Sequence, residues 1–157
     1  MKKSLGCFTR GLVALALLAV IGIVAASMLG GDGGSDTGGE FKGIVTIADP
    51  AAWVAQGEGC VGTGALDYIE GGASVVTADL KSSDNESESA LTNGVPFADG
   101  SCQFAFGGDA FTADTYLIAV GGTLARCDVS DIGVSGDDRI VEVLATADGL
   151  TCRPLGD

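Results

Sequence analysis

The stretch that decides the fold runs from Glu58 to Leu80 and reads EGCVGTGALDYIEGGASVVTADL. It begins with a cysteine among glycines, passes through a short acidic and aromatic turn, and ends in an apolar run that is β-branched at its centre. Glycines beside a cysteine favour a tight corner, because glycine adopts positive φ without a steric penalty. We therefore interpret this stretch as a structural corner that leads into a β-strand over 73–80.

The glycine-rich part of this stretch, GCVGTG, has the composition of a phosphate-binding loop but not its context. A dinucleotide fingerprint needs a strand before it and a helix after it, and a Walker loop needs Lys followed by Ser or Thr. Here a strand follows, and no such lysine is present. Nucleotide binding by this stretch is therefore not expected.

Four further segments alternate with period two between clusters of Gly, Asp, Ser and Asn, namely 41–47, 101–111, 115–127 and 138–147. Together with 73–80 they predict an all-β domain over 41–157. Short strands separated by turn signals favour a β-sandwich or small barrel over an α/β fold. We expect a small immunoglobulin-like β-sandwich.

Three connecting segments have their own character. Residues 81–94, KSSDNESESALTNG, contain only Ala90 and Leu91 as apolar residues, which predicts a solvated, mobile loop. Residues 128–138 form a second acidic loop, and 49–59 could hold one helical turn that starts near Pro50.

The N-terminal part differs in kind from the rest. Residues 1–10 form a basic tip, 11–29 are uncharged and almost entirely apolar, and 30–40 form a flexible Gly-rich linker. A helix over 11–29 would span about 28 Å, close to the roughly 30 Å of a hydrocarbon core. We expect a single transmembrane helix with the N-terminus in the cytoplasm and the C-terminal domain outside. The alternative is a signal peptide cleaved near Ala26, which would make the protein secreted.

The charge distribution excludes one class of partner. All 21 acidic residues follow residue 30 and only five basic residues accompany them, so the exported part carries a net charge of −16. Because no basic patch exists to meet phosphates, nucleic acid is not an expected partner. Such an acid excess serves solvation and repels non-specific contacts.

Five cysteines fall into two groups. Cys7 precedes the apolar segment, whereas Cys60, Cys102, Cys127 and Cys152 follow it. Four cysteines in a small exported domain indicate two disulfides, for which three connectivities are possible. The chain has no histidine and no C-x-x-C pair, which argues against a zinc site.

The same lack of histidine removes Ser-His and Cys-His nucleophile pairs, so we expect no enzyme and no cofactor. The alternative chemistry is a hard cation such as calcium, held by carboxylates of one acidic loop. The candidate ligands are Asp128, Asp131, Asp137 and Asp138. Trp53, the only tryptophan, is either a core residue or an exposed anchor for a partner.

Three stretches together carry a resemblance to a known group of proteins. GCVGTGALDYIEGGASVVTADL, LTNGVPFADGSCQFAF and TYLIAVGG, within about 59–122, combine a cysteine among glycines, an Asp-plus-Ile turn and a C-x-F-x-F strand. This combination resembles an uncharacterised family of small secreted or membrane-anchored β-domains of high-GC Gram-positive bacteria. The resemblance implies a β-sandwich ectodomain with a bridge between Cys60 and Cys102, and it implies no activity.

Cys127 and Cys152 lie beyond this pattern. Cys127 ends one predicted strand and Cys152 follows the last one, so a bridge between them would tie the C-terminus to the sheet. We expect a membrane-tethered, non-catalytic module that binds an envelope protein or a wall component. The alternative function is a cation or small-ligand binder that uses the acidic loops.

Overall fold

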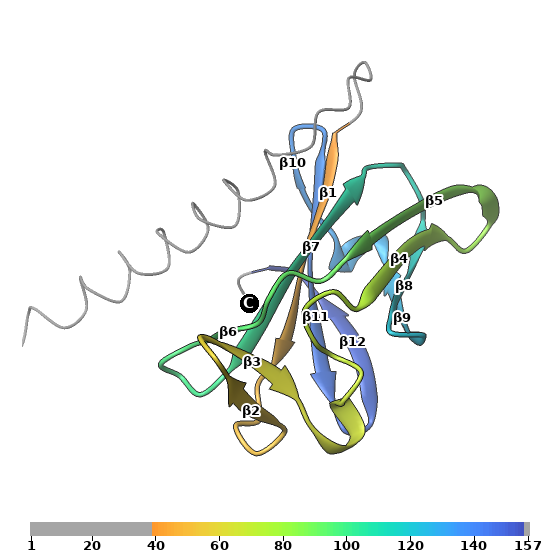
Figure 1. The fold of residues 1–157 in the computed structure, drawn as a ribbon. Coiled ribbons are helices and arrows are strands. Elements are labelled where there is room, and N and C mark those ends of the chain that lie inside the picture. Colours follow the sequence, from red (N-terminus) through yellow and green to blue (C-terminus); the bar gives the residue numbers. More distant parts are fainter. Residues whose placement is uncertain (1–38, 156–157) are drawn as a thin grey trace, which may run out of the picture. The chain divides into compact units, whose positions relative to one another are not determined.

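The computed structural model describes residues 39–155, which form β-strands joined by short turns (Figure 1). The expected all-β class is confirmed for these residues. The strands are β1 Glu40–Ile47, β2 Trp53–Gln56, β3 Gly59–Gly62, β4 Ser74–Asp79, β5 Ser82–Ala90, β6 Val95–Pro96, β7 Cys102–Asp109, β8 Thr115–Val120, β9 Thr123–Asp128, β10 Gly133–Ser135, β11 Asp138–Thr146 and β12 Gly149–Arg153. Two 3-10 turns, η2 and η3, span Gly64–Leu66 and Val129–Asp131.

The segments expected at the N-terminus, 1–10, 11–29 and nearly all of 30–40, lie outside the described residues. From residue 39 to residue 155, no helix reaches the length and hydropathy that crossing a bilayer requires.

The strands form two main sheets and one separate hairpin (Figure 1). The six-stranded sheet has the order β10-β11-β1-β7-β6, with β12 added beside β11, and the four-stranded sheet has the order β5-β4-β8-β9. Strand β1 lies between β11, to which it is parallel, and β7, to which it is antiparallel. In the immunoglobulin fold the first strand lies at a sheet edge, so the strand order differs from the immunoglobulin-like order that we expected.

The core lies between the two sheets and follows the period-two pattern of the sequence. Phe41, Val45 and Ile47 of β1 are buried, as are Val141 and Val143 of the neighbouring β11. Because successive side chains of a strand point to opposite faces, these alternating residues reach one layer. The strands predicted over 41–47 and 138–147 are therefore confirmed, and the structure shows which of their residues face the core.

An aromatic cluster fills the middle of this core. The ring of Phe41 lies 5.5 Å from that of Tyr116 on β8 and 6.3 Å from that of Phe106 on β7, measured between centroids. The ring of Phe106 occupies the space where a side chain at position 43 would stand, which explains Gly43 in β1. The Tyr116 hydroxyl donates a hydrogen bond of 2.8 Å to the carbonyl of Phe111, so its polar end is satisfied.

Two disulfides join the pairs of cysteines named above. Cys60 bonds to Cys102, with Cα atoms 6.2 Å apart, and fixes the β2–β3 hairpin to β7 of the six-stranded sheet. Cys127 bonds to Cys152, with Cα atoms 5.3 Å apart, and connects β9 with β12. Since β9 and β12 belong to different sheets, the second bridge ties the two sheets together.

The prediction of a mobile loop over 81–94 is wrong for most of that segment, because its residues form β5 at the edge of the four-stranded sheet. Glu86 and Glu88 are exposed while Ser87 and Ser89 are half-buried, so the alternation runs between acids and serines instead of between polar and apolar residues. The Ser87 hydroxyl accepts a hydrogen bond from the Asp109 amide at 3.1 Å, which helps to hold β5 beside β7.

Residues 115–127 form two strands and not one, because the chain reverses at Gly121 and Gly122 between β8 and β9. Both glycines have positive φ, 55° and 88°, as the two central residues of a type I′ hairpin turn require.

The expected helical turn in 49–59 is replaced by a tight turn and then β2. The Asp49 carbonyl accepts a hydrogen bond from the Ala52 amide at 3.0 Å, and from Trp53 onward the chain pairs with β3. Of Gly62 and Gly64, the two glycines that we expected to turn with positive φ, only Gly64 does so, with φ of 63°, and Gly62 belongs to the extended strand β3. The second acidic loop, 128–138, contains η3 and the edge strand β10.

Removing the Cys60–Cys102 bridge should destabilise the domain strongly. The bridge closes a chain separation of 42 residues, which in the chain-entropy model corresponds to about 4 kcal/mol, a large part of a typical stability of about 5–15 kcal/mol. We expect Cys60→Ala with Cys102→Ala to lower the free energy of unfolding of the full-length chain by that amount. Urea unfolding measures this free energy, and its midpoint should shift to lower urea. Cys7→Ala, which leaves both bridges intact, is the control, and a double variant as stable as this control would contradict the prediction.

Candidate functional site

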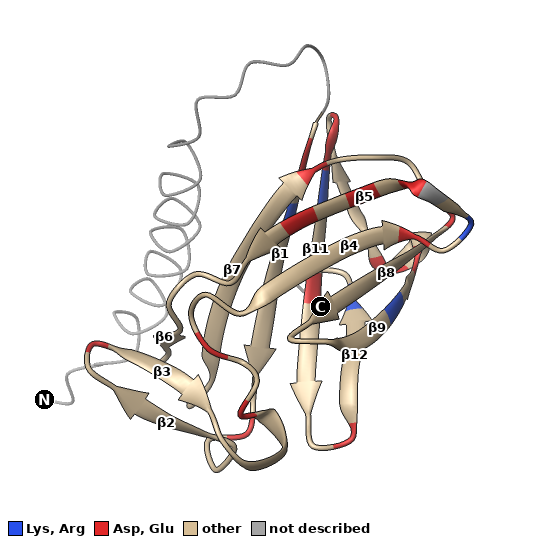
Figure 2. Ribbon diagram, turned by 45° about the vertical axis from the view of Figure 1, so that its right-hand side comes forward, with Lys and Arg blue, Asp and Glu red and all other residues tan. Residues whose placement is uncertain are grey.

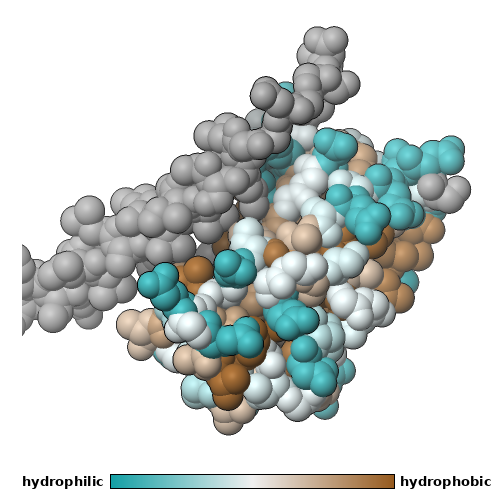
Figure 3. Space-filling view, in the orientation of Figure 1, coloured by the Kyte–Doolittle hydropathy of each residue, from teal (hydrophilic) through white to brown (hydrophobic). Residues whose placement is uncertain are grey.

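The outward-facing residues of β4 and β8 form an apolar surface. Val76 and Ala78 of β4, and Leu117 and Ala119 of β8, alternate with buried core residues and are half-buried themselves. On the neighbouring strand β9, Leu124 leaves 62% of its surface exposed. Figure 3 shows hydrophobic residues on the right-hand side, where β4, β8 and β9 lie, next to hydrophilic residues of the β4–β5 hairpin.

The strand pairing arranges this surface in two rows that each cross all four strands. From β5 through β4 and β8 to β9, the first row is Glu88, Val76, Ala119, Leu124 and the second row is Glu86, Ala78, Leu117, Arg126. We call these eight residues the outer face. At its centre each row has one larger and one smaller side chain. In the first row the larger residue, Val76, is on β4. In the second row the larger residue, Leu117, is on β8.

Opposite charges stand at the two edges of the outer face (Figure 2). Glu86 and Glu88 are exposed on β5, and Arg126 is exposed on β9. Neither glutamate nor Arg126 makes a salt bridge with any residue of the described chain. Three strand spacings, about 14 Å, separate Glu86 from Arg126, and no salt bridge joins them in the described structure.

Trp53 is held in place by the domain itself. Its indole ring packs against the edge of the core, and its Nε1 donates a hydrogen bond of 2.9 Å to the carbonyl of Gly100. The side chain is half-buried on β2. The ring thus contacts the core and keeps some exposed surface, and its role as an anchor for a partner stays a prediction.

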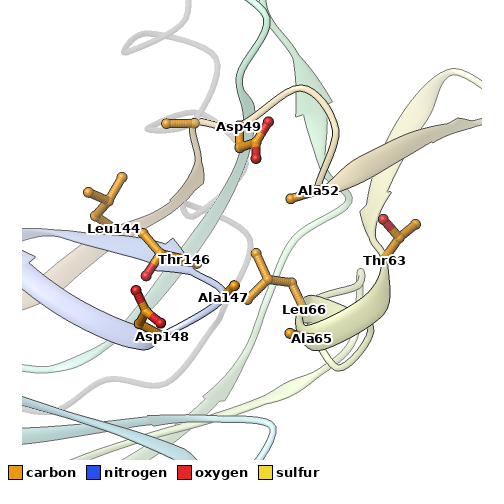
Figure 4. Close-up of a pocket in the computed structure, with 11 residues that line it drawn as sticks. Asp49, Ala52, Thr63, Ala65, Leu66, Leu144, Thr146, Ala147 and Asp148 are labelled. Atoms are coloured by element: carbon orange, nitrogen blue, oxygen red, sulfur yellow. The ribbon is translucent and has the colours of Figure 1, made fainter.

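A hollow of about 450 Å³ lies where the β1–β2 connection, η2 and the β11–β12 turn meet (Figure 4). Its wall consists mainly of alanines together with Leu66 and Leu144. Of its polar groups, the Asp49 carboxylate accepts a hydrogen bond from the Ala51 amide and Thr146 donates one to the Gly149 carbonyl. These two contacts stabilise turns, whereas the side chains of Thr63 and Asp148 in the wall make no hydrogen bond or salt bridge among the described residues.

The four candidate cation ligands do not converge. Asp128 and Asp131 form a capping box around η3, in which the Asp131 carboxylate accepts a hydrogen bond from the Asp128 amide. Asp137 and Asp138 belong to the β10–β11 turn, and the Lys42 ammonium donates a hydrogen bond of 2.6 Å to Asp138, which lowers the pKa of that carboxyl. In the part of the chain that the structure describes, no three His, Cys, Asp or Glu side chains come close enough to hold a metal ion.

A charged network not anticipated from the sequence lies on the six-stranded sheet. Glu142 of β11 is only 7% exposed; its carboxylate accepts hydrogen bonds from the Thr46 hydroxyl at 2.7 Å and from Arg153 at 2.9 and 3.0 Å. Burial by itself would raise the pKa of Glu142, but the hydrogen bonds from Arg153 and Thr46 outweigh it and lower the pKa below its ordinary value. The network links β1, β11 and β12.

No protein-family model, no curated protein and no solved structure matches this chain. The comparisons therefore assign neither a family nor an activity. What the chain can do has to be inferred from the geometry of residues 39–155.

Glu142→Gln should lower the free energy of unfolding of the domain at neutral pH, and this difference from the unaltered chain should disappear in acid. A carboxylate with a lowered folded-state pKa stabilises the fold above its unfolded pKa, and this stabilisation disappears as the pH falls through the folded-state pKa. We expect a loss of about 1–2 kcal/mol at pH 7, because charged hydrogen bonds are lost but Arg153 is partly solvent-exposed. Urea unfolding of the full-length chain at pH 7 and pH 3 measures both values.

Glu70→Gln is the matched control for this experiment, because Glu70 is exposed and its side chain makes no hydrogen bond or salt bridge in the described residues. An equal loss of stability in both variants, or a loss in Glu142→Gln that persists unchanged at pH 3, would contradict the role of the network.

Proposed function

We propose that this chain is a membrane-tethered extracellular β-domain that acts as a non-catalytic interaction or accessory module of the cell envelope. Its two facing sheets would form a sandwich-type ectodomain of the family that the sequence resembles. The observation that carries the proposal is the outer face, a flat apolar surface with charged edges on a small domain. Exposed apolar patches with polar rims are typical of protein interaction sites.

Export is supported by the cysteines and by the N-terminal sequence. Two disulfides are typical of proteins that fold outside the reducing cytosol. The uncharged segment 11–29 after a basic tip supports insertion with the N-terminus inside. The linker over 30–40 would then separate the bilayer from β1.

A non-catalytic role is supported by the fact that two of the four polar side chains of the hollow are already engaged in turns. Ligand pockets combine an apolar wall with a few polar groups aimed at the ligand. In this hollow Asp49 and Thr146 are engaged in turns, and the wall is otherwise made mostly of alanine and leucine. The alternative of a cation site is weakened by the contacts of Asp128, Asp131 and Asp138 within the domain.

The tether can be tested by adding protease to intact cells. We expect cleavage within 30–40 to release the domain 41–157 while the tip, 1–10, stays with the cell. The fragments are followed with tags at the two ends of the chain. A mature N-terminus at Ser27 would contradict the tether and leave only export, and a chain that is protected until the cells are broken would contradict both.

The interaction role can be tested by site-specific photo-cross-linking in living cells. A photoreactive amino acid at Leu124, on the outer face, should give discrete adducts with an envelope component. The matched control is the same amino acid at Val134, which is 65% exposed but belongs to β10 of the other sheet. Adducts that are absent at both positions, or equal at both, would contradict an interaction through the outer face.

A further inference from the structure

We propose that the outer face binds the outer face of a second copy of this chain in a two-fold symmetric dimer. This inference rests on the proposed function and names the partner of the interaction module. In such a dimer the same patch serves both copies, so the patch must be complementary to itself. The two rows of the outer face meet this requirement for one particular orientation.

The required two-fold axis runs parallel to the strands, between the facing sheets and midway between β4 and β8. It places β4 of one copy over β8 of the other and keeps each row opposite the same row. Val76 then lies over Ala119 of the second copy. In the next row, Leu117 lies over Ala78 of the second copy. Each large side chain therefore meets a small one, and the symmetry repeats both contacts.

The same axis places β5 of one copy over β9 of the other. Glu86 then lies opposite Arg126 of the second copy, and this pair occurs twice. Among residues 39–155 neither side chain has an ion-pair partner in its own copy, and the dimer would supply one. An axis across the strands would instead place Glu86 over Glu88, with like charges opposed. Charge thus favours the axis along the strands over the axis across them.

The size of the outer face limits how tight the dimer can be. Four strands at about 4.8 Å spacing and two rows, which together take up about four residues of strand length, cover roughly 260 Å² per copy, about a third of a standard interface. The net charge of −16 on each exported part adds long-range repulsion. The expected association is therefore weak, and tethering both copies in one membrane would raise their effective concentration.

One pair in this arrangement is mismatched. Leu124 lies over Glu88 of the second copy, where an apolar side chain meets an acid at the rim. Glu88→Gln should therefore tighten the dimer, because it removes this charge and lowers the repulsion between two acidic domains. Glu70→Gln removes one negative charge away from the outer face and is the matched control.

Charge exchange between Glu86 and Arg126 tests the geometry. Full-length chain in detergent micelles is labelled at its N-terminus with a donor or an acceptor dye, and energy transfer is measured against concentration. Arg126→Glu opposes two pairs of acids and Glu86→Arg opposes two pairs of bases. Each variant alone should associate roughly tenfold more weakly than the unaltered chain, as expected for two exposed ion pairs reversed in sign.

An equal mixture of the two variants should restore association, because in the mixed dimer both edges again pair an acid with a base. Lys81→Glu and Glu70→Arg change the net charge by the same amounts away from the outer face, and both should associate more strongly than the corresponding test variants. Restored energy transfer in the mixture, together with weak transfer in each variant alone, supports the dimer.

Three results would overturn the proposal: no concentration-dependent transfer for the unaltered chain, transfer indifferent to all four charge changes, or single variants that stay weak when mixed. Any of these would leave the proposed function standing if Leu124 still gave adducts with another envelope protein in cells. Adducts with twice the mass of the chain would instead agree with the dimer.

Discussion

The parallel pairing of β1 with β11 is the constraint on which the rest of the domain depends. It aligns Phe41 with Arg139 at one end and Ile47 with Ala145 at the other. Parallel neighbours cannot be joined by a tight turn, so a long crossover connection is required. Here the whole of 48–137 is that connection, and most of it folds as β-strands. The four-stranded sheet is therefore part of the crossover, folded back over the inner face of β1.

This arrangement explains why so many polar contacts gather along β1. The Lys42 ammonium bonds to Asp138 at the start of the paired region, and the Thr46 hydroxyl bonds to Glu142 near its end. Both contacts connect residues 96 positions apart in the chain. They fix the register of two strands that no short loop connects, and a slip of one residue would turn Val141 and Val143 away from the core.

The crossover also explains what is unusual about the outer face. The inner residues of β4 and β8, such as Val75 and Ile118, complete the core with β1. Their outward neighbours, Val76 and Leu117, are not needed for this packing and could have been polar. An apolar choice at such positions adds aggregation risk to an exposed sheet, and the proposed interface would account for it.

The sequence predicted the strands whose two faces differ in polarity. Phe41, Val45 and Ile47 alternate with other residues in β1, and Val141 and Val143 do so in β11, so the period-two pattern located both strands. Which face of each strand is buried followed only from the structure. Strand β5 was missed because its acids alternate with serines, so neither of its faces is apolar. The segment is a strand only because it pairs with the edge of β4. The outer face was missed for another reason: its rows depend on the register between β4 and β8, which the residues of either strand alone do not specify.

The resemblance did not supply these features either. It covers about half of the chain and implied a Cys60–Cys102 bridge, which the structure contains. The link from Glu142 to Arg153 lies beyond that region. This link depends on the pairing of β12 with β11. The sequence of β12, GLTCR, contains no pattern that predicts this pairing.

The central position of β1 has a mechanical consequence. The chain enters the domain at residue 39 and continues directly into β1, which is bonded along its length to β11 on one side and to β7 on the other. A force that pulls on this entry point acts along the strand axis. It loads the hydrogen bonds of both neighbours together, whereas a force on an edge strand would open them one after another. Under a pull along that axis, β1 would separate from the sheet only when its hydrogen bonds to β7 and to β11 shear together.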